Sequence, residues 1–305
     1  MKYTNLTPPL FNIKHLVEWR NYLEYNGFVV IQNILEPIDH ATIFTQFAKD
    51  WNYVTPAFNF HNKDTWTTNN CPMMWNKGMV YASGLGQTDF MWSLRTNQTI
   101  LSIWEGVHGT RDLVTSFDGF SVFLHPKQKS PMWLHVDQPS QDTIYSIQGA
   151  YNFLPVGEDD AGFVVVPRSH QTFVSSPTSR GNFIGISDDD PHVQNAVKLL
   201  IPANCFVLWN SKTIHANVGM SKSPQFNRLT AYISMFPKHQ RTQDIQQKRL
   251  AGYHNAHNCG HYAIRHNVKS HPYGLKTRYE ARGFLTIQPT LTQDGEIPPE
   301  RLQLI

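Results

Sequence analysis

The sequence predicts a mainly β fold with some α-helix, of the β-sandwich or barrel class. From about residue 116 the chain consists of short apolar runs separated by Gly, Pro, Asn and Asp, the pattern of strands joined by turns. Residues 14–26 and the stretch from Pro37 to about Trp51, in contrast, are expected to be helical. With 305 residues, 40 % of them hydrophobic, the chain is long enough to bury a sizeable core.

The expected elements follow in order along the chain. Residues 14–26 form an amphipathic pattern that includes Trp19 and Leu23, and Gly27 predicts the end of this helix. A strand is expected next, and Pro37 then begins a second helix that runs to about Trp51. The aromatic-rich residues 52–110 give no clear order of elements. The expected strands cover residues 28–31, 120–124, 144–153, 162–166, 205–209 and 228–236.

Composition excludes several classes of protein. The chain has 26 basic and 23 acidic residues, a formal charge of +3, so we expect neither a nucleic-acid nor a membrane partner. It has no apolar run long enough to span a membrane, and its start lacks the apolar stretch of a signal peptide. Three cysteines, Cys71, Cys205 and Cys259, argue against a disulfide scaffold and for the cytoplasm. The oligomeric state is not predicted.

The main chemical motif is the segment Trp133-Leu134-His135-Val136-Asp137-Gln138. Residues two apart in a strand point to the same side, so His135 and Asp137 are expected to reach one metal ion. With a third ligand from a distant strand they would form a facial triad, which leaves open positions and suits non-haem Fe(II). A His-x-Asp pattern alone is weak, because an exposed His beside a turn-capping Asp is the commoner case.

Two further residues strengthen this interpretation. His215 follows the strand that ends at Trp209, and Arg228 begins another strand thirteen residues after His215. An arginine that points into a β barrel needs a carboxylate partner, because an uncompensated buried cation is costly. A dicarboxylate cosubstrate would supply that partner with bidentate geometry.

The chain resembles a known family at several of these motifs. The run Tyr25 to Ile31, followed by Ile34-Leu35, is similar to the N-terminal opening of the phytanoyl-CoA dioxygenase-like Fe(II)/2-oxoglutarate oxygenases. The run Asp160 to His170 resembles their NGxxxVxPGSH segment. The resemblance covers about residues 22–50 and 117–236. It implies a double-stranded β-helix, that is, a jelly-roll or cupin-like core with N-terminal helices packed outside.

The resemblance also implies domain boundaries and residue roles. Residues 1–305 would be one oxygenase domain, with a helical part at 1–115, the jelly-roll core at 116–237 and a C-terminal extension at 238–305. The activity implied is a dioxygenase that hydroxylates a small-molecule or acyl substrate with O2 and releases succinate and CO2. Because Asp137 is present, hydroxylation is favoured over halogenation. His135, Asp137 and His215 would bind Fe(II), Arg228 and Thr230 the distal carboxylate of 2-oxoglutarate, and Tyr151 would also contact 2-oxoglutarate.

The substrate side is predicted from position. Trp133, Gln138, Arg168 and Trp209 are candidates for substrate contact, although core packing of the tryptophans and a solvated turn for Arg168 are the alternatives. Arg168 stands where the family has Gly, so we expect a different turn there. Residues 171–196 are expected to act as a lid hinged at Gly181 and Gly185, with a solvated loop as the alternative.

Two rival functions use the same residues. One is a non-catalytic jelly-roll binding protein with a vestigial metal site, which the joint presence of His135, Asp137, His215 and Arg228 argues against. The other is a zinc-dependent hydrolase, which has no need of Arg228. The histidine-rich tail suggests a second metal site, but its spacing matches no standard zinc pattern, so a surface cluster is expected. Its residues are His254, His257, Cys259, His261, His266 and His271.

Overall fold

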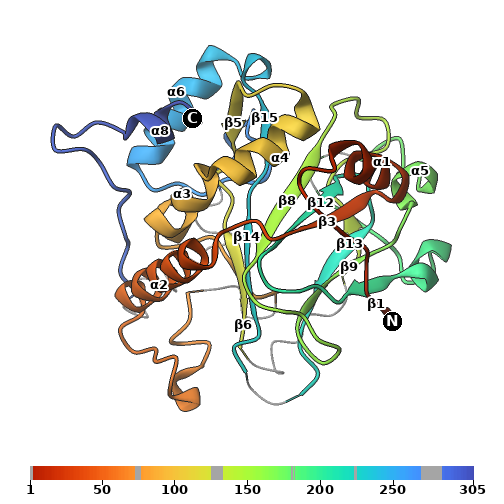
Figure 1. The fold of residues 1–305 in the computed structure, drawn as a ribbon, viewed down its shortest axis with the longest axis horizontal. Coiled ribbons are helices and arrows are strands. Elements are labelled where there is room, and N and C mark those ends of the chain that lie inside the picture. Colours follow the sequence, from red (N-terminus) through yellow and green to blue (C-terminus); the bar gives the residue numbers. More distant parts are fainter. Residues whose placement is uncertain are drawn as a thin grey trace. The chain divides into compact units, whose positions relative to one another are not determined.

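The computed structural model describes residues 3–72, 77–124, 133–179, 181, 183–222, 225–268 and 284–305. The chain divides into two compact units, each built from separated segments (Figure 1). The first unit contains Met1–Ile34 and Phe123–Thr230, and the second contains Leu35–Val122 and Ala231–Ile305. The sequence-based division into three consecutive parts differs from this interleaved arrangement. Strands and helices are both present, as expected. No helix in the described ranges is long and apolar enough to cross a membrane.

The first unit is built on two sheets. One has the strand order β1-β11-β9-β13-β7-β10, and the other has the order β2-β3-β12-β8-β14 within this unit. Phe163 from the first sheet and Trp209 from the second pack with ring centroids 4.8 Å apart, so these two sheets face each other. The strands are β1 (Thr4–Leu6), β2 (Leu10–Phe11), β3 (Phe28–Gln32), β7 (His135–Val136), β8 (Ile147–Asn152), β9 (Gly162–Val165), β10 (Ile184–Gly185), β11 (Val197–Leu199), β12 (Cys205–Asn210), β13 (His215–Val218) and β14 (Arg228–Tyr232).

The alternation of side chains along β7, β9 and β13 decides which residues point between the sheets. Val136, Val164 and Ala216 belong to one apolar cluster that packs on the outer face of their sheet. Their neighbours His135 and His215 therefore point to the opposite face, toward the second sheet. The helices of this unit, α1 (Leu16–Asn26), α5 (Ser169–Thr172) and the 3₁₀ helix η4 (Pro191–Asn195), lie outside these strands (Figure 1).

Gly27 ends α1 as predicted and connects the helix to β3. Its backbone is left-handed, with φ +79°, and its N–H donates to the Leu23 carbonyl. A Cβ here would lie 2.4 Å from Thr213 Oγ1 and 2.5 Å from His170 Nδ1. Thr213 Oγ1 also donates to the Gly27 carbonyl at 2.9 Å. A side chain at position 27 would therefore displace the segment that leads into His215.

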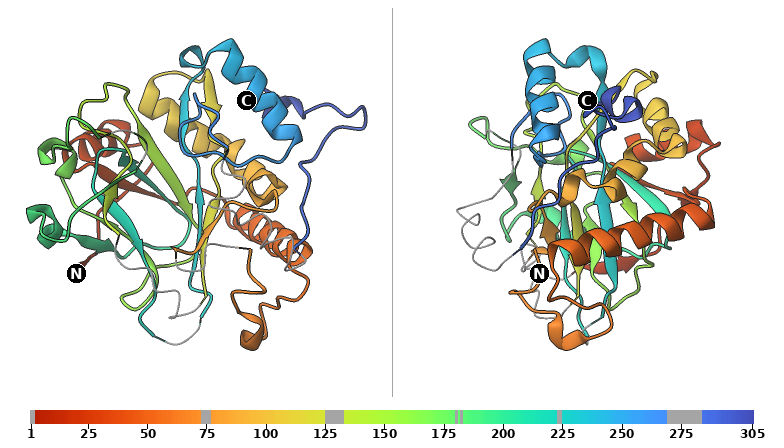
Figure 2. Two further views of the ribbon diagram at one scale, coloured as in Figure 1. Left: turned by 180° about the vertical axis from the view of Figure 1, so that it is seen from behind. Right: turned by 90° about the vertical axis from the view of Figure 1, so that its left-hand side faces the viewer.

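The second unit contains most of the helices, with α2 the longest (Figure 1, Figure 2). The aromatic segment that sequence left unassigned supplies its core, where Phe90 packs at 5.3 Å from both Phe47 and Phe120. Residues 228–236, expected to form one strand, form two. The elements are α2 (Pro37–Val54), η1 (Lys63–Thr65), β4 (Met79–Val80), η3 (Leu85–Gln87), α3 (Asp89–Arg95), α4 (Gln98–His108), β5 (Leu113–Thr115), β6 (Phe120–Phe123), β15 (Met235–Pro237), η5 (Lys238–Gln240), α6 (Gln243–His254) and α8 (Pro299–Leu302).

Candidate metal centre

The structure brings His135, Asp137 and His215 together between the two sheets of the first unit. His135 on β7 and His215 on β13 are register partners. Their Nε2 atoms lie 3.5 Å from Asp137 Oδ1 and 3.3 Å from Asp137 Oδ2, respectively. One ligand atom from each residue lies within 4.8 Å of the others. Both imidazoles are buried, so this geometry is held by packing and not by chance contact on a surface.

Backbone hydrogen bonds assign the tautomer of both histidines. His135 Nδ1 lies 3.0 Å from the Trp133 carbonyl, and His215 Nδ1 lies 2.9 Å from the Thr213 carbonyl. A carbonyl oxygen only accepts, so Nδ1 carries the proton in each ring. A neutral imidazole with this tautomer has its lone pair on Nε2, the atom that faces Asp137 in both residues. The same device, a carbonyl two residues upstream, prepares both rings to bind a metal.

Gln148 on β8 orients the carboxylate of the triad. Its Nε2 donates to Asp137 Oδ2 at 2.8 Å and to Ser211 Oγ at 3.2 Å. The Asp137 N–H donates to the Ser211 carbonyl at 2.9 Å, and Ser211 Oγ lies 2.7 Å from Ser146 Oγ. Sequence reasoning missed Gln148. Its signal was available, because a glutamine inside an apolar strand must find polar partners when the strand is buried.

Arg228 on β14 is buried, and its Nη2 donates to Asn217 Oδ1 at 2.8 Å. Asn217 is two residues after His215 on β13, so it points to the same face as His215. The guanidinium therefore lies on the side of the sheet that carries the metal ligands. Its carbon is 5.9 Å from the centre of the Phe123 ring. A cation buried at 2 % exposure requires strong compensation, which an anionic ligand would supply.

Thr230 and Tyr151 differ in their placement. Thr230 is two residues from Arg228 on β14, hence on the same face, and its Oγ1 donates to Asn152 Oδ1 at 3.1 Å. Tyr151 follows Ala150 and precedes Asn152 on β8, so it points away from the face that holds Gln148 and Asn152. Its hydroxyl donates to Asn204 Oδ1 at 2.8 Å. The structure does not bring Tyr151 to the triad. Tyr151 is three residues after Gln148 on β8, and side chains an odd number of residues apart in a strand point to opposite faces.

The two tryptophans proposed for the substrate side both lie beside the triad. The Trp133 ring stacks on His135, with centroids 4.4 Å apart and planes 4° apart. The Trp209 ring lies 5.5 Å from that of His215. Trp209 is 3 % exposed, and its Nε1 has no hydrogen-bond partner within the described parts of the chain. Trp209 thus presents an unused buried donor near the metal ligands.

Gln138 and Arg168 have structural contacts instead. Gln138 is buried and donates to the Ile144 carbonyl at 2.7 Å, which closes the loop after Asp137. Arg168 is exposed, and its guanidinium lies 4.7 Å from the centre of the Tyr25 ring. The expectation of a different turn at Arg168 is wrong, because its φ of +67° is the left-handed value that glycine favours. The contact with Tyr25 helps to hold the arginine in that conformation.

The insertion at 171–196 is attached to the metal-binding strand. Within it, β10 pairs with β7, so that Gly185 faces His135 and Ile184 faces Val136. The Ile186 N–H donates to the Leu134 carbonyl at 2.9 Å. Gly185 is therefore part of a paired strand, and the expectation that it acts as a hinge is wrong. Gly181 has φ +92° and open space around it, while Arg180 and Asn182 lie outside the described residues.

The tail cluster is buried in part, contrary to the expected surface cluster. Cys259 and His261 are 1 % and 6 % exposed. Cys259 Sγ lies 3.4 Å from His266 Nδ1, and His257 Nδ1 lies 3.5 Å from His266 Nε2. In the described part of the chain, only His135, Asp137 and His215 have the geometry of a metal site. His254 is exposed, and His271 lies outside the described residues.

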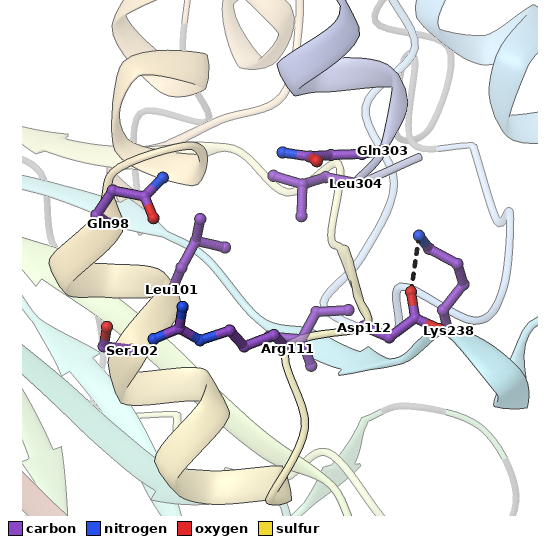
Figure 3. Close-up of a pocket in the computed structure, with 9 residues that line it drawn as sticks. Gln98, Leu101, Ser102, Arg111, Asp112, Lys238, Gln303 and Leu304 are labelled. Carbon is purple, nitrogen blue, oxygen red and sulfur yellow. Dashed lines mark ion pairs between the residues drawn. The ribbon is translucent and has the colours of Figure 1, made fainter.

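A pocket of about 220 Å³ lies in the second unit (Figure 3). Its two cations already have carboxylate partners. Arg111 Nε lies 2.7 Å from Glu105 Oε2, and Lys238 Nζ lies 2.9 Å from Asp112 Oδ1. None of the residues predicted for the site lines it. Its cations are thus neutralised by neighbouring carboxylates.

Several known proteins are similar to this chain. No protein-family model matches the chain. Ava biosynthesis cluster protein O of Aspergillus versicolor is 25 % identical over 249 residues, which cover 74 % of this chain and 79 % of that protein. The epimerase SnoN, solved with Fe3+, alpha ketoglutarate and nogalamycin RO, has a TM-score of 0.52 at 15 % identity, over 72 % of this chain and 83 % of SnoN.

A second solved structure is the non-heme alpha ketoglutarate dependent carbocyclase SnoK from nogalamycin biosynthesis. It has a TM-score of 0.53 at 15 % identity, over 74 % of this chain and 86 % of SnoK. This chain has the fold of these two enzymes. The expectation of a β-rich fold that also contains helices is confirmed at this level.

Proposed function

We propose that this chain is an Fe(II)- and 2-oxoglutarate-dependent oxygenase that hydroxylates a small molecule. One observation carries the proposal. Two buried imidazoles turn their Nε2 atoms toward the carboxylate of Asp137, and a buried arginine lies on the same face. Two nitrogens and one carboxylate oxygen are the ligand set of non-haem Fe(II) sites with open positions. A buried cation next to that set is what a dicarboxylate cosubstrate needs.

The residues present fit both groups. His135, Asp137 and His215 would hold Fe(II), and the hydrogen bonds to Trp133, Thr213 and Gln148 would fix their orientation. Arg228 would hold the distal carboxylate of 2-oxoglutarate, and Thr230 on the same strand face would add a hydroxyl. The unused Nε1 of Trp209 is a further donor for an oxygen ligand. When bound, the iron and 2-oxoglutarate supply the oxidation with O2, releasing succinate and CO2.

The protein's own part is to position these groups and to exclude water. Asn217 and Phe123 hold the Arg228 guanidinium before any ligand arrives, which lowers the entropic cost of binding. Phe163, Trp209 and the buried rings of the two histidines keep the surroundings apolar. An apolar setting strengthens every charge interaction in the site.

The finer assignments belong to the same proposal. We propose a phytanoyl-CoA dioxygenase-like enzyme with a double-stranded β-helix core, forming one domain over residues 1–305. We also propose a cytoplasmic protein, and the three cysteines, all buried and free, support a reducing compartment. Hydroxylation is proposed because the carboxylate ligand Asp137 is present. Epimerisation and ring closure, named for SnoN and SnoK, are the alternative outcomes.

The test is a titration followed by turnover. Without oxygen, Fe(II) and then 2-oxoglutarate should produce the visible charge-transfer band of the chelate, and Asp137→Ala should not. With oxygen, a metabolite panel screened for succinate release should identify a substrate whose product gains one oxygen atom. A band without succinate release for any compound would favour a vestigial binding protein. Tighter binding of Zn(II) with hydrolysis of panel esters, and no band, would favour a hydrolase.

A further inference from the structure

We propose that the substrate presents a flat, uncharged, unsaturated ring to an aromatic face, the exposed side of the ring stack of Trp133, His135 and Phe183. The inference rests on the proposed function and narrows it to a substrate class. Trp133, His135 and Phe183 have near-parallel rings. Phe183 lies 5.7 Å from Trp133 at 24° and 4.7 Å from His135 at 27°. At these centroid distances the rings stack on one another, and Phe183 is the exposed member of the stack beside the metal ligand.

The strand pairing fixes this aromatic face in place. Trp133 and His135 are two residues apart, so their rings share one side of the strand. Phe183 precedes β10 directly, and β10 pairs with β7 in a register that sets Gly185 opposite His135. The phenyl ring is thereby brought onto the histidine by backbone hydrogen bonds. Phe183 is nevertheless 52 % exposed, so a large part of its surface remains available to a ligand.

Exposed aromatic area beside a metal ligand favours a planar partner. Aromatic side chains bury large areas, and parallel offset rings add about 0.5–1.5 kcal/mol beyond the area that is buried. A single exposed hydrophobic residue is ordinary on a protein surface. Here the exposed ring is stacked on a buried metal ligand and aligned with a second aromatic ring, which makes it part of the site.

The charges near this face argue against an anionic substrate such as an acyl-CoA. Residues 133–144 and 183–195 contain no Lys or Arg, but they contain Asp137, Asp142 and the triplet Asp188-Asp189-Asp190. The neighbouring cations are Lys212, whose Nζ donates to the carbonyls of Ser140 and Asp142, and Arg180, which precedes Phe183 by three residues in the sequence. Asp188 and Asp189 are exposed, whereas Asp190 lies 2.7 Å from His192 Nδ1. Carboxylates on the segment that carries Phe183 would repel the phosphates of coenzyme A. An uncharged ring meets no such penalty.

The experiment compares two ligands of equal size that differ in planarity. 2-Naphthol and its saturated analogue decahydro-2-naphthol are titrated into the full-length protein, metal-free and with Fe(II) and 2-oxoglutarate without oxygen. Calorimetry should show that 2-naphthol binds about 2- to 10-fold more tightly, the gain expected from one aromatic contact. Phe183→Leu keeps an apolar side chain and should abolish this preference. Tyr53→Leu, at a residue of matched exposure (54 %) on α2, should leave it unchanged.

Equal binding of the two ligands would overturn the inference, and so would an unchanged preference in Phe183→Leu. Tighter binding of decanoyl-CoA than of 2-naphthol would also overturn it. These failures are separable from failure of the proposed function. If the charge-transfer band forms and the planar preference is absent, only the substrate class is wrong. If the preference is present in metal-free protein and no band forms, the aromatic face is right and the oxygenase assignment is wrong.

Discussion

The two histidine clusters of this chain use the imidazole ring in opposite ways. In the metal centre, His135 and His215 each donate Nδ1–H to a backbone carbonyl and turn Nε2 toward Asp137. In the tail, His257 and His266 face each other, and Cys259 contacts the second nitrogen of His266. One cluster leaves coordinating atoms available at a common point. The other uses them within the cluster.

The difference shows why the number of histidines in a segment is a poor guide to a metal site. The tail has more histidines in a short stretch of sequence. The two ring nitrogens of His266, however, face two different residues, His257 and Cys259. The metal centre takes its histidines from two strands that are far apart in the sequence and paired in the sheet. In both cases the backbone carbonyl two residues before the histidine orients the ring. What identifies the site is convergence of lone pairs on one point together with a carboxylate.

The largest effect is expected from removing the carboxylate. Asp137→Ala should weaken Fe(II) binding by more than about 100-fold and abolish turnover, because loss of an outer partner alone costs 10- to 100-fold. The fold should persist, since the side chain lies at the edge of the core with 13 % exposure. Fe(II) affinity is measured by anaerobic titration. His266→Ala, the matched change in the other cluster, should leave that affinity within twofold.

The removal of Arg228 should separate cosubstrate binding from metal binding. Arg228→Ala should weaken 2-oxoglutarate binding by about 2–5 kcal/mol, because a buried carboxylate would lose its charge-assisted partner. Fe(II) affinity should stay nearly constant, since Arg228 is not a ligand. The readout is the 2-oxoglutarate dependence of the charge-transfer band. Arg168→Ala removes an exposed arginine and serves as control. A change within twofold for Arg228→Ala would place the carboxylate partner elsewhere.

The sequence predicts the three residues of the triad because short local patterns indicate them. His-x-Asp on a strand, a later His and an Arg that starts a strand are each visible along the chain, and the structure brings the triad together. The sequence contains no sign that a second arginine, Arg95, is also buried. Arg95 donates to the carbonyls of Gly86 and Asp118 at 2.7 Å and 2.8 Å, a purely structural role that only the fold reveals.

The parts that sequence missed depend on register between distant strands. Gln148 reaches Asp137 only because β8 lies in the facing sheet, and Phe183 reaches His135 only because β10 pairs with β7. The resemblance predicts that Tyr151 contacts 2-oxoglutarate. In the structure its neighbours Ala150 and Asn152 point to the face of β8 that carries Gln148, and Tyr151 points to the other face. The first helix and the strand after it were predicted closely, because Gly27 between them ends the helix and this signal lies in the local sequence.

Gln148 offers a sharper test of how the metal centre is prepared. Gln148→Leu removes the donor to Asp137 Oδ2 and should weaken Fe(II) binding by about 10- to 100-fold, the range for partners that orient a metal ligand. The absorption spectrum of the Co(II)-substituted protein should also change, because a released carboxylate alters the coordination geometry. Gln141→Leu, at an exposed glutamine, is the control. Equal Co(II) spectra and equal affinity for wild type and Gln148→Leu would contradict the role.

The smallest effect is expected in the tail, where the change should alter stability and not metal binding. Burial lowers the pKa of His266 to about 4 from its ordinary value near 6.5, with Arg249 and His257 adding repulsion. The folded state thus favours the neutral ring. The stability that depends on this neutrality is complete above pH 6.5 and is lost as pH falls from 6.5 toward 4. Because His266 is only partly buried, solvent screening reduces the effect to about 1 kcal/mol.

In the His266→Asn variant the free energy of unfolding, measured by denaturant titration, should therefore fall less steeply between pH 6.5 and 4 than in wild type. The Fe(II) affinity of the metal centre should be unchanged. An acid profile identical to wild type would show that His266 titrates normally in the folded protein, and the contrast between the two clusters would then concern geometry alone.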